Sequence, residues 1–176
     1  MSDKSPSTFV SGLESVVAAE TRLSDVDGEA GDFIVAGFPV EEFASHASFE
    51  ETVYLLWHDA LPDPEQLATF REALSIRRPI PRAVLDLMRR AAQEKASAMD
   101  VLRMATGALS LSTTSGAAVE DEFYCDALSL VARFPTIVAA YRRLLDGEEP
   151  VAPDPALGHT ANYLHMLNGE SPGDEP

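Results

Sequence analysis

The chain has 176 residues, 45% of them hydrophobic, and carries 29 acidic against 13 basic side chains, a formal net charge of −16. This length suffices for one domain with its own hydrophobic core. A surface this acidic repels nucleic acid and anionic membranes, because both are bound through cationic faces, so neither is expected as a partner. The acidic residues are spread along the chain, and two explanations stay open: a salt-loving source, or an acidic protein from an ordinary one.

The sequence gives simple expectations about the compartment. No apolar run approaches the length that crosses a bilayer, and the opening MSDKSPST lacks the apolar middle of a signal peptide. The single cysteine, Cys125, excludes an internal disulfide. We therefore expect a cytoplasmic protein that does not bind a membrane.

The first part of the chain does not have helical periodicity. Residues 1–8 are small and polar and are expected to form a disordered tail. Short β-branched pieces follow up to residue 35, separated by turn residues such as Asp27-Gly28. This pattern predicts a small β-hairpin around Asp27-Gly28, the only β structure expected.

From residue 39 on, apolar residues recur every three or four positions, which predicts helices. Ser48 and Glu51 form a capping box at the start of one helix, and Asp63-Pro64 starts the next. A stiff connector, residues 77–81, separates that helix from the one after it. The expected helices cover residues 39–44, 48–61, 63–76, 82–92, 97–111, 122–145 and about 156–168, the last closed by Gly169.

The other elements are organised around residues 122–145, EFYCDALSLVARFPTIVAAYRRLL. Pro135 lies inside this helix and is expected to kink it. The stripe expected to face the core contains Phe123, Ala127, Leu130, Val131, Phe134, Val138, Tyr141 and Leu145. A second apolar set widens it, namely Leu128, Ala132, Ile137, Ala139 and Leu144. A helix that is apolar nearly all round needs neighbours on several sides.

These elements predict an all-α fold, mainly a helical bundle, with a small N-terminal β-hairpin. Residues 9–169 are expected to form the domain, and residues 170–176 a linker-like tail. The central helix has more apolar circumference than its own domain should cover. Self-association, or pairing with a partner, is therefore expected through residues 97–111 and 122–145.

The residues alone predict no active site. None of the four histidines, His46, His58, His159 and His165, has metal-ligand spacing, and Cys125 is interpreted as a small core residue. Adjacent acids such as Glu50 and Glu51 are interpreted as solvated charge. The loop of residues 110–122 lacks a phosphate-binding glycine motif. No catalytic or metal-binding residue is therefore named, and cofactor-binding residues stay unknown.

Several stretches, in order over nearly the whole chain, resemble the citrate synthase family. They are GLESVVAAETRLSDVDGEAG, SFEETVYLLWHDALPDPEQLATF, AMDVLRMATGAL, ARFPTIVAAYRR and GHTANYLHMLNGESP. They are similar to the family's T-x-[IL]-S-x-[IV]-D-G turn, its LLW and LP landmarks, its L-R helix, its A-[RK]-[LF]-P helix and its N-[FY]-L-x-M-L segment. The resemblance covers the N-terminal half of the family's large domain.

The resemblance implies a mostly helical, obligately dimeric acyltransferase about twice this length. Helices matching residues 97–111 and 122–145 pack against their two-fold mates in the family. The family condenses acetyl-CoA with oxaloacetate to citrate and CoA in the tricarboxylic acid cycle. An aspartate and a histidine act on acetyl-CoA, while another histidine and several arginines hold oxaloacetate.

All of those catalytic groups belong to the part of the family sequence beyond the point this chain reaches. The next family landmark, an H-A-D-H-like segment, is absent from the 176 residues. No catalytic residue is therefore carried over, and His159 is assigned a structural role. A second departure is Val35-Ala36-Gly37, where the family usually reads Y-R-G.

Three hypotheses remain. The first is the N-terminal half of a citrate synthase, inactive alone, with no covalently bound cofactor and with acetyl-CoA as a substrate once a second half completes it. Its partner would be a second copy or a chain carrying the C-terminal half. The alternative, which the Ala36 departure favours, is a non-catalytic dimerisation or scaffold module derived from citrate synthase. The third is an acidic helical domain unrelated in function.

Overall fold

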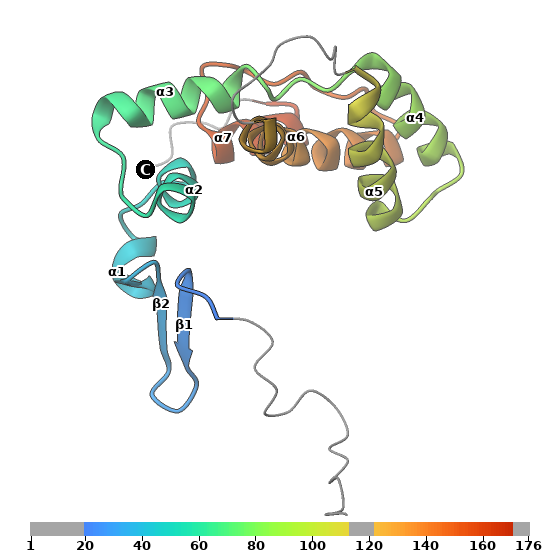
Figure 1. Cartoon of the computed structure of the whole chain (residues 1–176). Helices are drawn as coiled ribbons and strands as arrows, with labels where there is room; N and C mark the ends of the chain where they lie inside the picture. Colours follow the sequence, from blue (N-terminus) through green and yellow to red (C-terminus); the bar gives the residue numbers. More distant parts are fainter. Residues whose placement is uncertain (1–19, 113–121, 171–176) are drawn as a thin grey trace, which may run out of the picture. The chain divides into compact units, whose positions relative to one another are not determined.

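The computed structural model describes residues 20–112 and 122–170 and divides the chain into two compact units, Met1–His46 and Ala47–Pro176 (Figure 1). In its described residues, the N-terminal unit contains a small antiparallel sheet and one short helix. In the second unit, all secondary-structure elements of the described residues are helices. The all-α class with a small N-terminal sheet is therefore confirmed.

The N-terminal unit is built on the predicted hairpin. Strands β1 (Ser24–Asp27) and β2 (Asp32–Val35) pair antiparallel, with Ser24 opposite Val35 and Asp27 opposite Asp32. The carboxylate of Asp27 accepts hydrogen bonds from the backbone N–H groups of Glu29 (2.9 Å) and Ala30 (3.0 Å), which closes the turn. These bonds also lower the pKa of Asp27.

A third strand was not predicted. Strand β3 (Phe38–Pro39) pairs with β2 and leads directly into helix α1 (Val40–Ala44). Two residues are too few to show an alternating pattern, so the sequence carried no signal for this strand. The β2–β3 turn places Ala36 at φ 47° and Gly37 at φ 91°. Glycine adopts such angles without strain, whereas a side chain there costs about 1 kcal/mol.

The helical unit begins with α2 (Phe49–His58) and α3 (Pro64–Ser75). Both start at the predicted capping residues. Ser48 forms a capping box with Glu51, and Asp63 forms one with Gln66. The remaining elements are α4 (Arg82–Gln93), α5 (Ala98–Ala108), the 3₁₀ turn η1 (Leu109–Ser112), α6 (Glu122–Leu145) and α7 (His159–Asn168).

Three helices are shorter than predicted. Helix α2 was predicted to reach residue 61 but ends at His58, because Asp59 adopts a left-handed conformation with φ 57°. Helix α5 ends at Ala108 because its last turn tightens into η1. Helix α7 starts at His159 rather than near residue 156, because the Asp154 carboxylate accepts the N–H of Ala156 (2.8 Å) in a local turn. Its predicted end is confirmed, with Gly169 at φ 80°.

Helix α6 contacts α3, α4, α5 and α7 and carries two hydrophobic clusters (Figure 1). Near its start, Leu128 and Ala132 pack on Phe70 and Leu74 of α3. Further along, the larger cluster joins α4, α5 and α6 through Val84, Met88, Val101, Ala105, Ile137, Ala140 and Tyr141. The core therefore lies between α6 and the helices around it.

The expectation that no run approaches membrane-spanning length needs a correction. By length and composition alone, the 23 residues Phe123–Leu145 could cross a bilayer, with a mean hydropathy of 1.3. One side of this helix packs on the helices described above. That packing is what the core helix of a helical bundle shows, and such helices are commonly apolar nearly all round.

Candidate assembly surface and buried polar cluster

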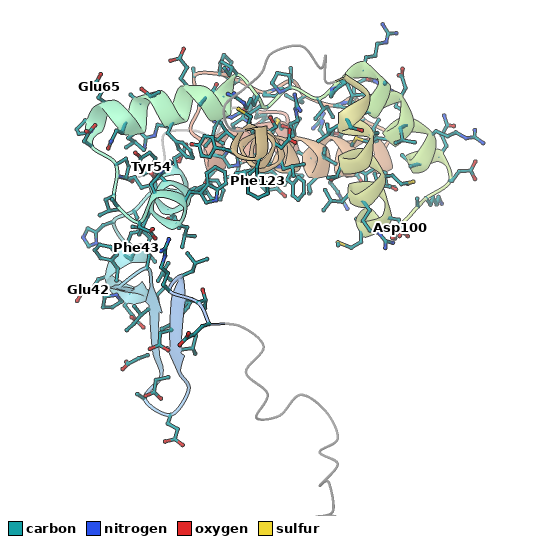
Figure 2. All side chains as sticks on the ribbon, viewed as in Figure 1. Glu42, Phe43, Tyr54, Glu65, Asp100 and Phe123 are labelled. Atoms are coloured by element: carbon teal, nitrogen blue, oxygen red, sulfur yellow. The ribbon has the colours of Figure 1, made fainter. Side chains whose placement is uncertain are left out.

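One side of α6 carries large apolar side chains that the described chain leaves uncovered. We call this stripe, Phe123, Phe134, Val138 and Leu145, the open face. Phe123 is 85% exposed and Val138 is 42% exposed. Phe123 is labelled on α6 in Figure 2. The successive spacings of the four residues, eleven, four and seven positions, place all of them on the same side of the helix.

The open face belongs to the stripe that was predicted to face the core, so that prediction was wrong for these four residues. The buried positions come instead from the second apolar set, and Leu128, Ala132, Ile137 and Ala139 are each at most 2% exposed. Tyr141 is the member of the first stripe that is buried. The reason is physical: apolar spacing marks a face that avoids water, but does not tell which chain or segment covers it.

The C-terminal half of the open face forms the floor of a groove of about 820 Å³. Met99 and Leu102 of α5 line it, together with Tyr163 and Leu167 of α7. Below the floor, the Tyr141 hydroxyl donates a hydrogen bond to the Ala96 carbonyl, which ties α6 to the start of α5. The groove is thus an apolar channel along α6 between two other helices, a shape that suits an amphipathic helix.

The rim of the groove is polar. Arg142 pairs with Asp146 (2.9 Å), and Arg143 pairs with Glu148 (2.9 Å). Arg143 also donates to the carbonyl of Glu149 (2.8 Å), which fixes the chain just after α6. An apolar centre with a charged rim is the usual composition of a protein interface.

A second notable feature is a buried polar cluster, the linker clamp, formed by Glu50, Arg78, Asp154, His159 and Asn162. Glu50 is only 4% exposed, and its Oε1 accepts the backbone N–H of His159 (2.8 Å). The carboxylate thereby satisfies the first turn of α7, whose N-cap Gly158 has no side chain to do so. The interpretation of Glu50 as solvated charge was therefore wrong.

Arg78 and Asn162 hold the extended segment between α6 and α7. Arg78 Nη1 donates to the carbonyls of Asp154 (3.0 Å) and Leu157 (2.8 Å), and Asn162 Oδ1 accepts the N–H of Asp154 (2.8 Å). Burial lowers the pKa of Arg78, and the charges of Glu50 and Asp154 oppose that shift. The clamp thus joins the starts of α2 and α7 to the end of α3.

His159 lies inside the clamp. Its ring stacks on Phe49 with centroids 4.4 Å apart, and neither ring nitrogen has a hydrogen-bond partner among the residues described. Burial lowers its pKa most, the Arg78 charge lowers it further, and Glu50 acts in the opposite direction. The structural role expected for His159 stays a prediction, which these contacts support.

The other candidate residues are not brought together. His58 lies against the rings of Tyr54 and Tyr124, the ring of His46 bonds the carbonyl of Glu42, and Cys125 is half-buried. Within residues 20–112 and 122–170, no group of three His, Cys, Asp or Glu side chains could hold a metal ion. Most of the predicted 110–122 loop lies outside the described residues.

The fold is thus a helical bundle with a buried polar clamp and a long uncovered apolar face, a kind of surface that is common in domains that assemble with a further chain or segment. Comparison with known proteins then gives the family. A family model described as "Citrate synthase, C-terminal domain" matches residues 12–176. The chain belongs to the citrate synthase family.

Individual relatives agree with this assignment. Citrate synthase of Haloferax volcanii is 42% identical over 93% of this chain and 44% of its own length. A 2-methylcitrate synthase of Mycobacterium tuberculosis is 34% identical over 92% of this chain and 40% of its own length. The chain therefore spans less than half the length of these curated relatives.

Solved structures show the same relation. The crystal structure of Pyrobaculum aerophilum citrate synthase superposes with a TM-score of 0.83 at 32% identity, covering 92% of this chain and 42% of that one. The structure of Thermoplasma acidophilum citrate synthase, a ternary complex with carboxymethyl coenzyme A and oxaloacetate, gives a TM-score of 0.81 at 26% identity, covering 92% of this chain and 42% of that one.

Proposed function

We propose that this chain forms the N-terminal helical part of a citrate synthase, the acyltransferase of the tricarboxylic acid cycle that condenses acetyl-CoA with oxaloacetate to citrate and CoA. The remainder of the fold would be supplied by further sequence or by a companion chain. One observation carries the proposal: the chain matches the family over nearly all of its length but spans only about 44% of its relative from Haloferax volcanii. The uncovered face of α6 supports it, because a complete fold would cover such a surface.

The matching family model is described as a C-terminal domain, whereas the motif order suggests the first half of the family sequence. The opening T-R-L-S-D-V-D-G turn, the LLW landmark, the A-R-F-P helix and the N-Y-L-H-M-L segment follow one another in the order of the family's first half. We therefore assign the chain to the N-terminal half of the large domain.

The catalytic aspartate and histidines of the family belong, by the resemblance, to the missing half. We propose that this chain alone is inactive, binds no cofactor covalently, and takes part in acetyl-CoA chemistry only when the second half is present. The acyl donor would be either acetyl-CoA or a related acyl thioester, since one relative is named a 2-methylcitrate synthase. We also propose that the protein is cytoplasmic and that its acidic surface is an adaptation to high salt.

The partners we propose are a second copy of the chain and the companion half. Covering several hundred Å² of apolar surface on the open face would contribute several kcal/mol, at about 25 cal/mol per Å², before the cost of association. A two-fold dimer places the same helix of each copy at the interface, so that one apolar stripe covers its equivalent.

The decisive experiment is a citrate synthase assay that follows thiol release from acetyl-CoA with oxaloacetate. We expect no activity from the purified chain, none from a separately expressed second half, and activity when the two are mixed. A Val138→Glu chain is a useful addition, since it should weaken assembly while leaving the fold intact. Activity of the chain alone, above a no-protein control, would refute the proposed division of the catalytic residues.

The second candidate is a non-catalytic dimerisation or scaffold module. Ala36 favours it, because this residue occupies a left-handed position, φ 47°, where the family usually has an arginine. In that case the chain would bind a second copy or a full-length relative without adding activity. Assembly by light scattering, combined with an inactive mixture in the assay, would select this candidate over the first.

A further inference from the structure

Basic residues are unevenly distributed in this acidic chain. Between residues 71 and 95 there are seven basic and three acidic residues, a net charge of +4 in a chain whose total is −16. This segment contains the end of α3, the connector of residues 77–81 and helix α4. More than half of the 13 basic residues therefore lie in about one seventh of the sequence.

Some of these cations are neutralised and others are not. On α4, Arg89 pairs with Glu149 and Arg90 pairs with Glu94. Around the connector, no carboxylate of the described residues lies within ion-pair distance of Arg77, Arg82 or Arg133. Uncompensated guanidinium groups are unusual on a surface with more than two acidic residues for each basic one.

The structure brings Arg77 and Arg133 together at the connector. Arg133 lies on α6, and its Nε donates to the carbonyl of Pro79 (3.2 Å), while Arg77 Nη1 donates to the carbonyl of Ala73 (2.9 Å). Both side chains are half-buried. Burial lowers the pKa of Arg133 most, and the neighbouring charge of Arg77 lowers it further, so the two cations repel each other.

Each of these two guanidinium groups uses one of its five N–H donors in the bonds above. The remaining donors can bind oxygen atoms in a planar, forked geometry. Arg82 follows as the first residue of α4, whose first turn contains no acidic side chain. Arg77, Arg82 and Arg133 thus place free donors and positive charge beside the connector, and none of the three is ion-paired with a carboxylate of the described residues.

We propose that Arg77 and Arg133, flanked by Arg82, form a binding site for a small, multiply charged oxyanion. Two guanidinium groups at one connector, each with free N–H donors, suit the oxygens of a phosphate or polycarboxylate, and a bound anion would relieve their mutual repulsion. Because both side chains are half-buried, the site suits a small anion better than a protein segment, which needs protruding donors.

Isothermal titration calorimetry of the full 176-residue chain tests the site. The probes are inorganic pyrophosphate and citrate, each titrated at the same low ionic strength, because screening weakens such contacts. We expect one binding event per chain for at least one probe, weakened about tenfold or more in Arg77→Gln and in Arg133→Gln. Binding of pyrophosphate alone indicates a phosphate ligand, and binding of citrate alone a polycarboxylate.

Arg103→Gln is the matched control. It removes the same charge from an exposed arginine that pairs with Asp100 on its own helix, so it should bind the probes as the parent chain does. Absence of binding by both probes, or an equal loss in Arg103→Gln, would overturn the proposal.

Circular dichroism melts check that each variant is folded, and Arg77→Gln decides the matter if Arg133→Gln is unfolded. Arginine Nε–H resonances give an independent measurement. The signals of Arg77 and Arg133 should shift on addition of the bound probe while that of Arg103 does not. Shifts confined to other arginines would place the anion elsewhere and contradict the site.

Discussion

The two faces of α6 are made of similar residues, yet the described chain covers only one of them. On the covered face, Ile137 and Ala139 are almost fully buried among neighbouring helices. On the open face, Phe134, Val138 and Leu145 are each between 37% and 42% exposed. The helix has 24 residues, about 36 Å of length, so the uncovered stripe is long enough for a second helix to pack along it. The comparison teaches that apolar periodicity identifies both a domain core and an interface, without distinguishing them.

The sharpest test of this comparison uses two neighbouring residues. Ala139→Glu should destabilise the fold by about 3–5 kcal/mol, because it buries an unpaired carboxylate. Val138→Glu should change the free energy of unfolding by less than about 0.5 kcal/mol, since Val138 contacts solvent. Urea unfolding followed by circular dichroism measures both values.

The same pair separates folding from assembly. Val138→Glu should shift the protein to smaller species in light scattering, while its circular dichroism spectrum stays that of the parent chain. A parent chain that is monomeric at all concentrations would show that the open face tolerates water. Equal destabilisation by the two substitutions would show that the two faces do not differ.

The linker clamp is buried, as the covered face of α6 is, and its carboxylate provides the next largest effect. Glu50→Ala should cost about 1–3 kcal/mol, because it removes the acceptor of the His159 N–H and one of the two carboxylates, Glu50 and Asp154, whose charges favour the buried Arg78 cation. Glu72→Ala, at an exposed position on α3, is the control and should stay within about 0.5 kcal/mol of the parent. If the two variants had equal stability, Glu50 would not contribute to the clamp.

The clamp also predicts a dependence on pH. The pKa of His159 is lowered in the folded state, so the unfolded chain binds this proton first as the pH falls. Stability should therefore be fully present above about pH 6.5 and decrease below it, with a slope of at most about 1.4 kcal/mol per pH unit from this group. Urea midpoints measured at several pH values, for the parent and for His159→Gln, should show a shallower slope in the variant. An unchanged slope would assign the effect to other groups.

The smallest expected effect is the change of melting temperature with salt concentration. Screening of the net charge of −16 should raise the melting temperature by about 2–4 °C between low salt and molar potassium chloride, the shift that about 1 kcal/mol produces in a chain of this size. The open face is apolar, so self-association should also strengthen with salt. A melting temperature that falls with salt would show that stabilising ion pairs outweigh the general repulsion.

The sequence by itself determined the features whose signals are local. Ser48 and Asp63 start helices because their side chains bond the first free N–H groups, and Gly169 ends α7 because it adopts a left-handed conformation. Asp27-Gly28 marks the hairpin for a similar reason. The family could also be recognised, since its motifs follow one another along nearly the whole chain.

Only the tertiary structure decided the features that join distant residues. Glu50 caps a helix that begins 109 residues later, and Arg133 lies against a connector 54 residues before it. No local pattern distinguishes such a carboxylate from a solvated one. Which side of α6 faces the core was likewise undetermined, because both sides are apolar and the burial of each depends on which other elements pack against it.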